Sequence, residues 1–165
     1  MSIEKARAHL KKWGRDKDII EFDVSSATVQ LAALALNTEE SMIAKSISLK
    51  GQTGAFLVVT AGDVKIDNQR FKQEFGFKAK MLTADEVKEW IGHEIGGVCP
   101  FGIHENVSVF LDASLKRFDK IFPACGSSNS AIPVTCKELE EICGHVKWVD
   151  VCKEKEKPIK MENSL

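Results

Sequence analysis

The sequence predicts a single domain of the mixed α/β class, in which helices surround a curved mixed sheet. The chain has 165 residues, of which 44% are hydrophobic and 28% charged, a composition typical of a globular domain with one core. Helix and strand patterns alternate along the chain and include a hairpin, which favours a mixed sheet with helices packed on it. No apolar run approaches the ~20 residues of a membrane helix, and residues 1–17 lack the apolar core of a signal peptide. We therefore expect a cytoplasmic protein without membrane contact.

Two helices and a short strand are expected in the first part of the chain. Residues 3–14 place apolar side chains on one helical stripe and end at a glycine. Residues 19–22 have the composition of a short strand. Residues 27–36 are rich in alanine and leucine, which favours a buried helix.

The middle of the chain holds the clearest pair of strands. Residues 43–50 alternate apolar and polar side chains as a half-buried strand does, and the nearly apolar residues 55–60 favour a central strand. The two glycines of residues 51–54 indicate a hairpin turn between them. A helix over residues 67–75 and a strand over residues 78–82 are expected to follow.

Two capping boxes mark the later helices. Each is a threonine followed three positions later by a glutamate, and they start helices near residues 84–91 and 136–143. Further strands are expected over residues 107–111, 121–122, 131–134 and 146–151.

Lys45 interrupts the apolar face of the strand over residues 43–50. Side chains two apart share a face, so Lys45 lies among Ile43, Ile47 and Leu49. Lysine is rarely buried without a partner. An unpaired one loses its charge, with a pKa lower by as much as ~3–5 units, and a charged one needs a carboxylate or an anionic ligand. The position suggests a functional site. The alternatives are that Lys45 extends to the sheet edge on its aliphatic stem, or that the strand register differs.

A glycine loop follows in residues 96–102, which hold three glycines and one proline. These residues fix an unusual backbone path, and glycine lets a ligand approach the main chain. The amides of Gly97, Val98 and Cys99 could then point at a carbonyl oxygen or an oxyanion. The loop lacks the Gly-Lys-Ser/Thr ending of a phosphate loop and the spacing of a dinucleotide fingerprint. The alternative is a tight loop that only reverses the chain. A second cluster of small residues, 124–130, is by itself an ordinary polar turn.

Charge and cysteine content narrow the function classes. The net charge is −1, so the molecule as a whole does not attract nucleic acid, although residues 1–17 carry six basic side chains against two acidic ones. Such a patch can bind a phosphate backbone, or it can be a solvated helix face. The five cysteines are odd in number and show no Cys-x-x-Cys spacing. We therefore expect free thiols, with no disulfide framework, no metal site and no cofactor.

Together these segments resemble the YbaK/ProX family of aminoacyl-tRNA deacylases, which are related to the editing domain of bacterial prolyl-tRNA synthetases. The segments that carry the resemblance are, in order, Ala44-Lys45-Ser46, residues 95–102, Val109-Phe110-Leu111-Asp112, Ala124-Cys125-Gly126-Ser127 and the helix start at residues 135–139. The resemblance extends from about residue 3 to residue 152. It implies a YbaK-like editing domain over residues 1–152. The charged composition of residues 153–165 predicts a flexible tail.

The resemblance implies hydrolysis of the ester that joins a wrong amino acid to its tRNA. It implies Lys45 as the essential catalytic residue and residues 96–100 as the loop that shapes the aminoacyl pocket. The expected substrate-binding residues are Ser46, Gly96, Gly97, Val98, Cys99, Pro100, Gly126 and Ser127. The sequence holds no convincing Ser-His-Asp or Cys-His set, so a water or a substrate group is the expected nucleophile. The partner is the aminoacylated 3′ end of tRNA, met alone or together with an aminoacyl-tRNA synthetase.

The substrate is expected to carry a small amino acid, such as Cys, Ala, Ser or Thr, on the tRNA for proline, selected largely by pocket volume. Two other functions stay open. The domain could be a non-catalytic module that binds an aminoacyl or nucleotide end. It could also be a thiol hydrolase that uses Cys99, where many relatives have Ser or Thr, although nothing in the sequence indicates a lowered pKa of this thiol. His93 and His104 flank the loop and are expected at the surface or in a supporting position.

Overall fold

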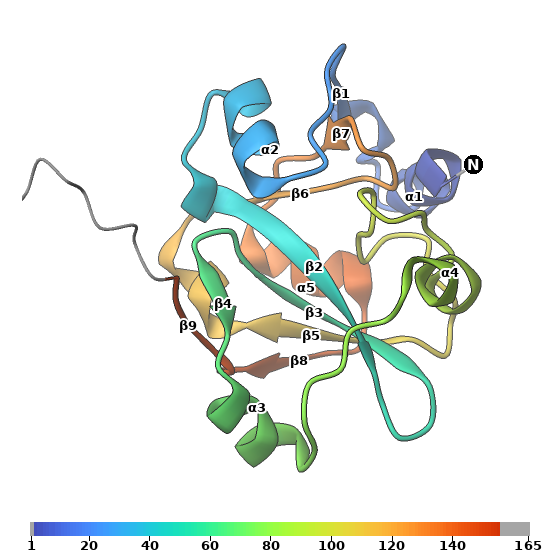
Figure 1. Cartoon of the computed structure of the whole chain (residues 1–165). Coiled ribbons are helices and arrows are strands. Elements are labelled where there is room, and N and C mark those ends of the chain that lie inside the picture. Colours follow the sequence, from blue (N-terminus) through green and yellow to red (C-terminus); the bar gives the residue numbers. More distant parts are fainter. Residues whose placement is uncertain (1, 156–165) are drawn as a thin grey trace, which may run out of the picture.

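A five-stranded mixed sheet forms the centre of the computed structural model, which describes residues 2–155 (Figure 1). The strand order is β6-β2-β3-β5-β8. β2 and β3 are antiparallel, whereas β2 and β6, β3 and β5, and β5 and β8 are parallel. The strands are β2 (Ile43–Lys50), β3 (Ala55–Ala61), β5 (Ser108–Asp112), β6 (Phe122–Pro123) and β8 (Val146–Val149). The expected mixed α/β class is confirmed.

Two small antiparallel sheets flank the central one. β1 (Ile20–Glu21) pairs with β7 (Ser130–Ala131), and β4 (Val64–Ile66) pairs with β9 (Cys152–Glu154). The second pair was not expected from the sequence. β9 carries ordered structure to Glu154, two residues into the segment expected to be a tail. The remainder of that segment, residues 156–165, lies outside the described residues.

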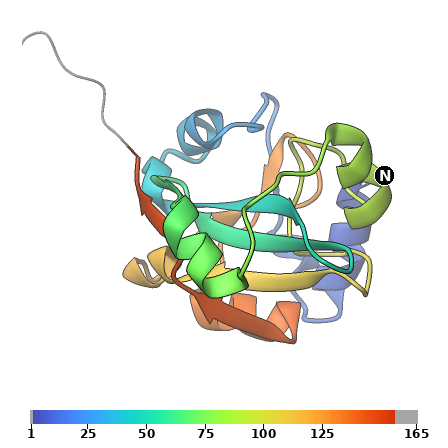
Figure 2. The same ribbon diagram turned by 60° about the horizontal axis from the view of Figure 1, so that its bottom comes forward.

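Five helices surround the central sheet, with α5 on one side of it and α2 on the other (Figure 2). They are α1 (Ser2–Lys11), α2 (Val29–Leu36), α3 (Asn68–Phe75), α4 (Ala84–Glu86) and α5 (Cys136–Cys143). Short turns of other helix types are η1 (Asp16–Asp18), η2 (Glu40–Met42), η3 (Val87–Ile91) and η4 (Ala113–Arg117), of which η3 is a π-helical turn. Both predicted capping boxes are present, at Thr83 with Glu86 and at Thr135 with Glu138.

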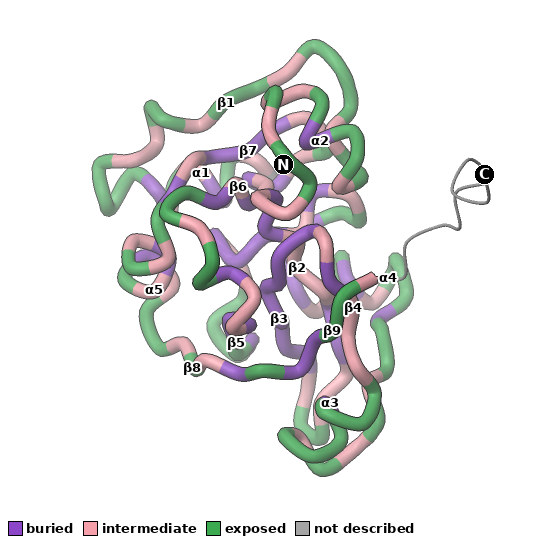
Figure 3. Tube along the Cα trace, turned by 90° about the vertical axis from the view of Figure 1, so that its left-hand side faces the viewer, coloured by how far each residue is buried: buried purple, intermediate pink, exposed green. Residues whose placement is uncertain are grey.

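The core lies around β3, whose seven residues are all buried, whereas α3 is mostly exposed (Figure 3). Phe56 on this strand packs against rings of α3 and β5, with ring centroids 5.1 Å from Phe75 and 5.6 Å from Phe110. This burial explains why residues 55–60 are almost entirely apolar, because a central strand has no solvated face.

Three expectations need correction. Residues 78–82 form no strand and meet β2 only through an isolated bridge between Leu49 and Met81. The helix expected near 84–91 is a single α-turn followed by η3. The helix α2 is not buried as its composition suggested, since Leu31 and Leu34 are 42% and 78% exposed. Within α2, Ala32 and Ala33 are buried, and Val29 and Leu36 pack partly buried against the same cluster.

Candidate functional site

A cavity of about 180 Å³ opens beside β2. One side is the polar face of that strand, with Ala44, Ser46 and Ser48. The other walls come from the start of α2, the glycine loop and the strands β6 and β7. Their residues include Thr28, Val29, Ala32, Ile95, Gly96, Val98, Phe122, Ala124, Ser130 and Ala131. The lining therefore combines small apolar side chains with several hydroxyl groups, which suits a small ligand that has both apolar and polar parts.

Ser46 provides an unused polar group in this cavity. Its Oγ is buried and has no hydrogen-bond partner within residues 2–155. A buried hydroxyl without a partner costs free energy, and such groups in native proteins call for an explanation. A ligand that exchanges a hydrogen bond with Ser46 would supply one.

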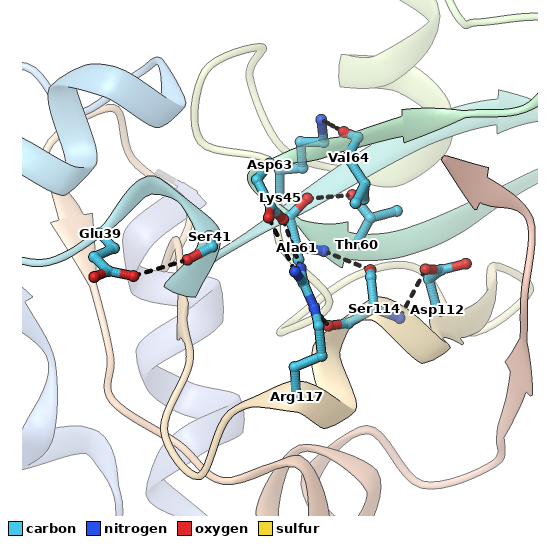
Figure 4. Close-up of polar contacts among 10 residues, drawn as sticks. All are labelled: Glu39, Ser41, Lys45, Thr60, Ala61, Asp63, Val64, Asp112, Ser114 and Arg117. Atoms are coloured by element: carbon cyan, nitrogen blue, oxygen red, sulfur yellow. Dashed lines mark hydrogen bonds and ion pairs between the residues drawn. The ribbon is translucent and has the colours of Figure 1, made fainter. Parts of the chain in front are cut away.

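Lys45 lies at the edge of the same cavity. Its Nζ donates a hydrogen bond to the carbonyl oxygen of Val64 on β4 (Figure 4). Burial, together with the nearby charge of Lys155, lowers the pKa of Lys45 from its ordinary value of 10.5 to about 8. An ammonium group has three donors, so Lys45 can keep the bond to Val64 and still offer N–H groups to a ligand.

A network of side chains holds the turn between β3 and β4, directly before Val64. Arg117 binds Asp63 through two nitrogens at 2.6 and 3.0 Å, and its Nε donates to the carbonyl oxygen of Ser114 at 2.9 Å (Figure 4). The hydroxyl of Ser114 accepts a bond from the amide of Ala61 at 3.1 Å. The carbonyl that positions the Lys45 ammonium is thus fixed from both sides of the turn.

Only part of the predicted glycine loop reaches the cavity. Gly96, with φ +95°, and Val98 line it. Gly97 packs against the second cluster of small residues, and a Cβ on it would lie 2.6 Å from the carbonyl carbon of Gly126 and from the amide nitrogen of Ser127. Its own amide donates to the carbonyl oxygen of Glu94 at 3.1 Å and so is already used within the loop.

Cys99 lies behind the loop and does not line the cavity. Cys99 is fully buried and its neighbour Pro100 is buried. The Sγ of Cys99 is 3.4 Å from Nε2 of His93 and 3.6 Å from the carbonyl oxygen of Phe101. Burial raises the pKa of this thiol to about 12. His93 is also completely buried and shares a hydrogen bond of 2.7 Å with the same carbonyl oxygen, so it supports the loop from inside.

The structure therefore divides the predicted site residues into two groups. Lys45, Ser46, Gly96 and Val98 lie together around the cavity. The others pack behind it or face a neighbouring hollow: Gly97, Cys99, Pro100, Gly126 and Ser127. Ser48, Thr28 and Ser130 also line the cavity and were not predicted. Ser48 could have been predicted from the sequence, because it lies on the same face of the strand as Ser46. Within the described residues, no group of three or more His, Cys, Asp or Glu side chains could hold a metal ion.

Comparison with known proteins identifies the family. The model of the aminoacyl-tRNA editing domain matches residues 24–142, a segment that includes the whole lining of the cavity. The chain belongs to the aminoacyl-tRNA editing domain family. The uncharacterized protein YwhH of Bacillus subtilis is 53% identical over 155 residues, which are 93% of this chain and 99% of that protein.

Two further relatives connect this editing domain with prolyl-tRNA synthetases. The proline–tRNA ligase of Bacillus pumilus is 30% identical over 123 residues, covering 70% of this chain and 22% of the ligase. A crystal structure described as that of a proposed trans-editing enzyme for prolyl tRNA synthetase superposes with a TM-score of 0.83 at 27% identity, covering 92% of this chain and 97% of that one. These findings support a role in tRNA editing. None of the helices between residues 2 and 155 is long and apolar enough to cross a membrane.

Proposed function

We propose that this editing domain is a free-standing hydrolase that cleaves the ester bond of mischarged aminoacyl-tRNA. The observation that carries the proposal is that Lys45 and Ser46 both line one small cavity, where the buried hydroxyl of Ser46 has no partner among the described residues. The likeness to a proposed trans-editing enzyme over nearly the full length of both chains supports a free-standing form. Aminoacyl-tRNA, met alone or with a synthetase in the cytoplasm, is the proposed partner.

The proposed substrate carries a small amino acid, such as Cys, Ala, Ser or Thr, on the tRNA for proline. Several small residues line the cavity, Ala44, Gly96 and Ala124 among them, and they support selection of the side chain by volume. One methylene group changes binding by only about 1–3 kcal/mol, so steric exclusion of larger residues is more effective than attraction of the correct one. The similarity to proline–tRNA ligases is the reason for proposing this tRNA.

The proposed mechanism assigns positioning and electrostatic roles to the protein. Lys45 holds the terminal phosphate or the ester carbonyl with the N–H groups that Val64 leaves free, and Ser46 donates its hydroxyl to the ester. Donors that are fixed in advance stabilise the negative charge that develops on the carbonyl oxygen. A water molecule or the neighbouring ribose hydroxyl is the proposed nucleophile, since Cys99 is a buried thiol with a raised pKa.

Deacylation of a panel of tRNAs charged with Cys, Ala, Ser, Thr and Pro tests this function. We expect selective hydrolysis by the wild type and a loss of at least about 100-fold in Lys45→Ala, the scale of one lost transition-state donor. Lys50→Ala is the matched control, because Lys50 lies on the same strand but outside the cavity. Equal activity of wild type and Lys45→Ala would contradict the proposed site.

A non-catalytic module that binds the aminoacyl end is the second candidate. It is favoured by one observation: apart from the amine of Lys45, none of the described residues that line the cavity could act as a general base, since none is a carboxylate, a histidine or a thiol. This candidate predicts that the wild type binds aminoacyl-tRNA without hydrolysing any member of the panel. Lys45→Ala would then weaken binding only.

A further inference from the structure

A second cavity lies beside the first, on the other side of the glycine loop. Its volume is about 490 Å³. Ile95 lines both cavities, Gly96 lines the first, and Gly97 lines the second. The close approach of Gly97 to Gly126 joins the two small-residue loops into the wall between them. A linear ligand whose end occupies the first cavity would therefore cross the exposed side chain of Ile95 to enter the second cavity.

The second cavity carries a positive charge supplied by two separate elements. Lys5 of α1 and Lys88 of η3 both line it. The Nζ of Lys5 donates to the carbonyl oxygen of Gly92 at 3.3 Å, which is an uncharged acceptor. Lys88 and Glu94 approach to 3.9 Å, but both side chains are more than 70% exposed, so this ion pair is weak. Glu94 is the one carboxylate among the described lining residues, against two ammonium groups.

The neutral groups of this cavity suit a nucleotide. Ser127 and Ser128 are among the lining residues, although the hydroxyl of Ser127 already bonds to Asn129 and Ser130. His93 also lines it, and Nδ1 of His93 is buried without a partner among residues 2–155. Because Nε2 faces a carbonyl oxygen at 2.7 Å, that nitrogen carries the proton and Nδ1 is an acceptor. An acceptor matches a ribose hydroxyl or a base amine and does not match a phosphate oxygen.

The two arginines of the N-terminal segment already form ion pairs. Arg7 pairs with Glu21 at 3.3 Å. Arg15 pairs with Asp18 at 2.6 Å and also binds Glu138. Both arginines of the basic patch in residues 1–17 are therefore engaged in ion pairs, and of its lysines Lys5 lines the second cavity.

We propose that the second cavity binds a phosphodiester in the single-stranded 3′ end of the RNA, with Lys5 and Lys88 contacting the phosphate. This inference rests on the proposed function, since it takes the terminal aminoacyl group to occupy the first cavity. It assigns to the cavity the nucleotides next to the charged terminus. Recognition there is independent of the amino acid, because phosphate contacts position a nucleic acid without selecting its sequence.

Binding of an uncharged RNA tests the inference without using hydrolysis. The probe is a 5′-labelled RNA hairpin with a single-stranded 3′ end that terminates in CCA, followed by fluorescence anisotropy between about 50 and 200 mM salt. We expect Lys5→Ala/Lys88→Ala to bind about tenfold more weakly. Its log–log salt slope should be smaller by about 1.4, since each single-strand phosphate contact contributes about 0.7. Lys72→Ala/Lys137→Ala, which removes two exposed lysines that line no cavity described here, should match the wild type.

Two further variants separate charge from folding. Lys88→Ala alone changes an exposed side chain and should fold normally, with about half of the loss in salt slope. Lys5→Arg/Lys88→Arg keeps both charges and should keep the affinity. A double alanine variant that binds within twofold of the wild type, or a wild type that does not bind the hairpin, would overturn the inference. If lysine-dependent binding holds but no charged tRNA is hydrolysed, the proposed function fails and the phosphodiester site remains.

Discussion

Lys45 combines a half-buried position with an ammonium that is held by a backbone carbonyl. The lowered pKa, about 8, has burial as its largest cause and the charge of Lys155 as the next. Because the folded value lies below the ordinary value of 10.5, the charged form is lost as the pH rises through about 8. Between about pH 8 and 10.5 the unfolded chain binds more protons than the folded one, so the contribution of Lys45 to stability improves as the pH rises.

This pKa predicts the pH dependence of deacylation. If the charged form of Lys45 acts on the substrate, the enzymatic rate, corrected for spontaneous ester hydrolysis, should fall above about pH 8. Lys155→Ala removes a neighbouring positive charge and should move the fall to higher pH, because it raises the pKa of Lys45. Lys65→Ala, on β4 nearby, is the control. If the rate of Lys155→Ala falls at the same pH as that of the wild type, a group other than Lys45 causes the fall.

Cys99 is a candidate nucleophile whose buried surroundings disfavour the reactive thiolate form. A thiol that is completely buried and has a pKa near 12 holds almost no thiolate at neutral pH. We expect Cys99→Ser to keep kcat/KM for deacylation within about threefold and to lower stability by about 1 kcal/mol, the typical effect of a core substitution. Iodoacetamide should leave native activity unchanged. Inactivation by this reagent that Cys99→Ser abolishes would instead support thiol catalysis.

Single elements were predictable where their signals are local. The hairpin of β2 and β3 follows from alternation and two glycines, and both capping boxes join residues three positions apart. The pairing of β4 with β9 was missed because two three-residue strands from distant parts of the chain leave no periodic pattern. The same limit applies to the site. Lys45 and Ser46 stand out within β2, whereas Thr28 and Ser130 reach the cavity only through tertiary packing.

The glycine loop over residues 96–102 packs against the cluster over residues 124–130, and this contact depends on the absence of a side chain at Gly97. Its φ is not in the left-handed region, so glycine is needed there for space. In Gly97→Ala the new Cβ would meet backbone atoms at 2.6 Å, and the loops must separate. We expect a loss of about 2–3 kcal/mol in denaturant unfolding, as for overpacking, with kcat/KM down more than tenfold.

Gly144→Ala is the comparison for this prediction. Gly144 has φ +82° and open space around its Cβ position. Its ψ of −116° places it in a region that almost only glycine adopts, so the substitution costs about 1–3 kcal/mol through backbone conformation alone. Gly144 does not line the cavity, so deacylation should be unaffected. Full activity of Gly97→Ala would show that the loop contact does not shape the site.

On the scale of the whole molecule, Asp112 connects the sheet with the turn that serves the site. It ends β5 and is 1% exposed. One carboxylate oxygen accepts a bond from the amide of Val151 and the other from the amide of Ser114, both at 2.9 Å. Ser114 in turn binds the backbone at Ala61, just before the turn that leads to Val64 and the Lys45 ammonium. One buried carboxylate thus links β5, the segment before β9, and the support of the proposed catalytic lysine.

Asp112→Ala should therefore destabilise the fold and disturb the site together. It leaves two buried amides without their charged acceptor, and hydrogen bonds to charged groups contribute about 1.5–3 kcal/mol each. We expect a loss of about 3 kcal/mol in denaturant unfolding, with a smaller loss for Asp112→Asn, which keeps one acceptor oxygen. In the folded Asn variant, the alkaline limb of deacylation should shift, because the carbonyl that holds Lys45 is less firmly placed. Asp119→Ala removes an exposed carboxylate and should change stability by less than about 0.5 kcal/mol. If Asp112→Ala is no less stable than this control, the two amides have found other acceptors, and the connection from β5 to Lys45 is not structural.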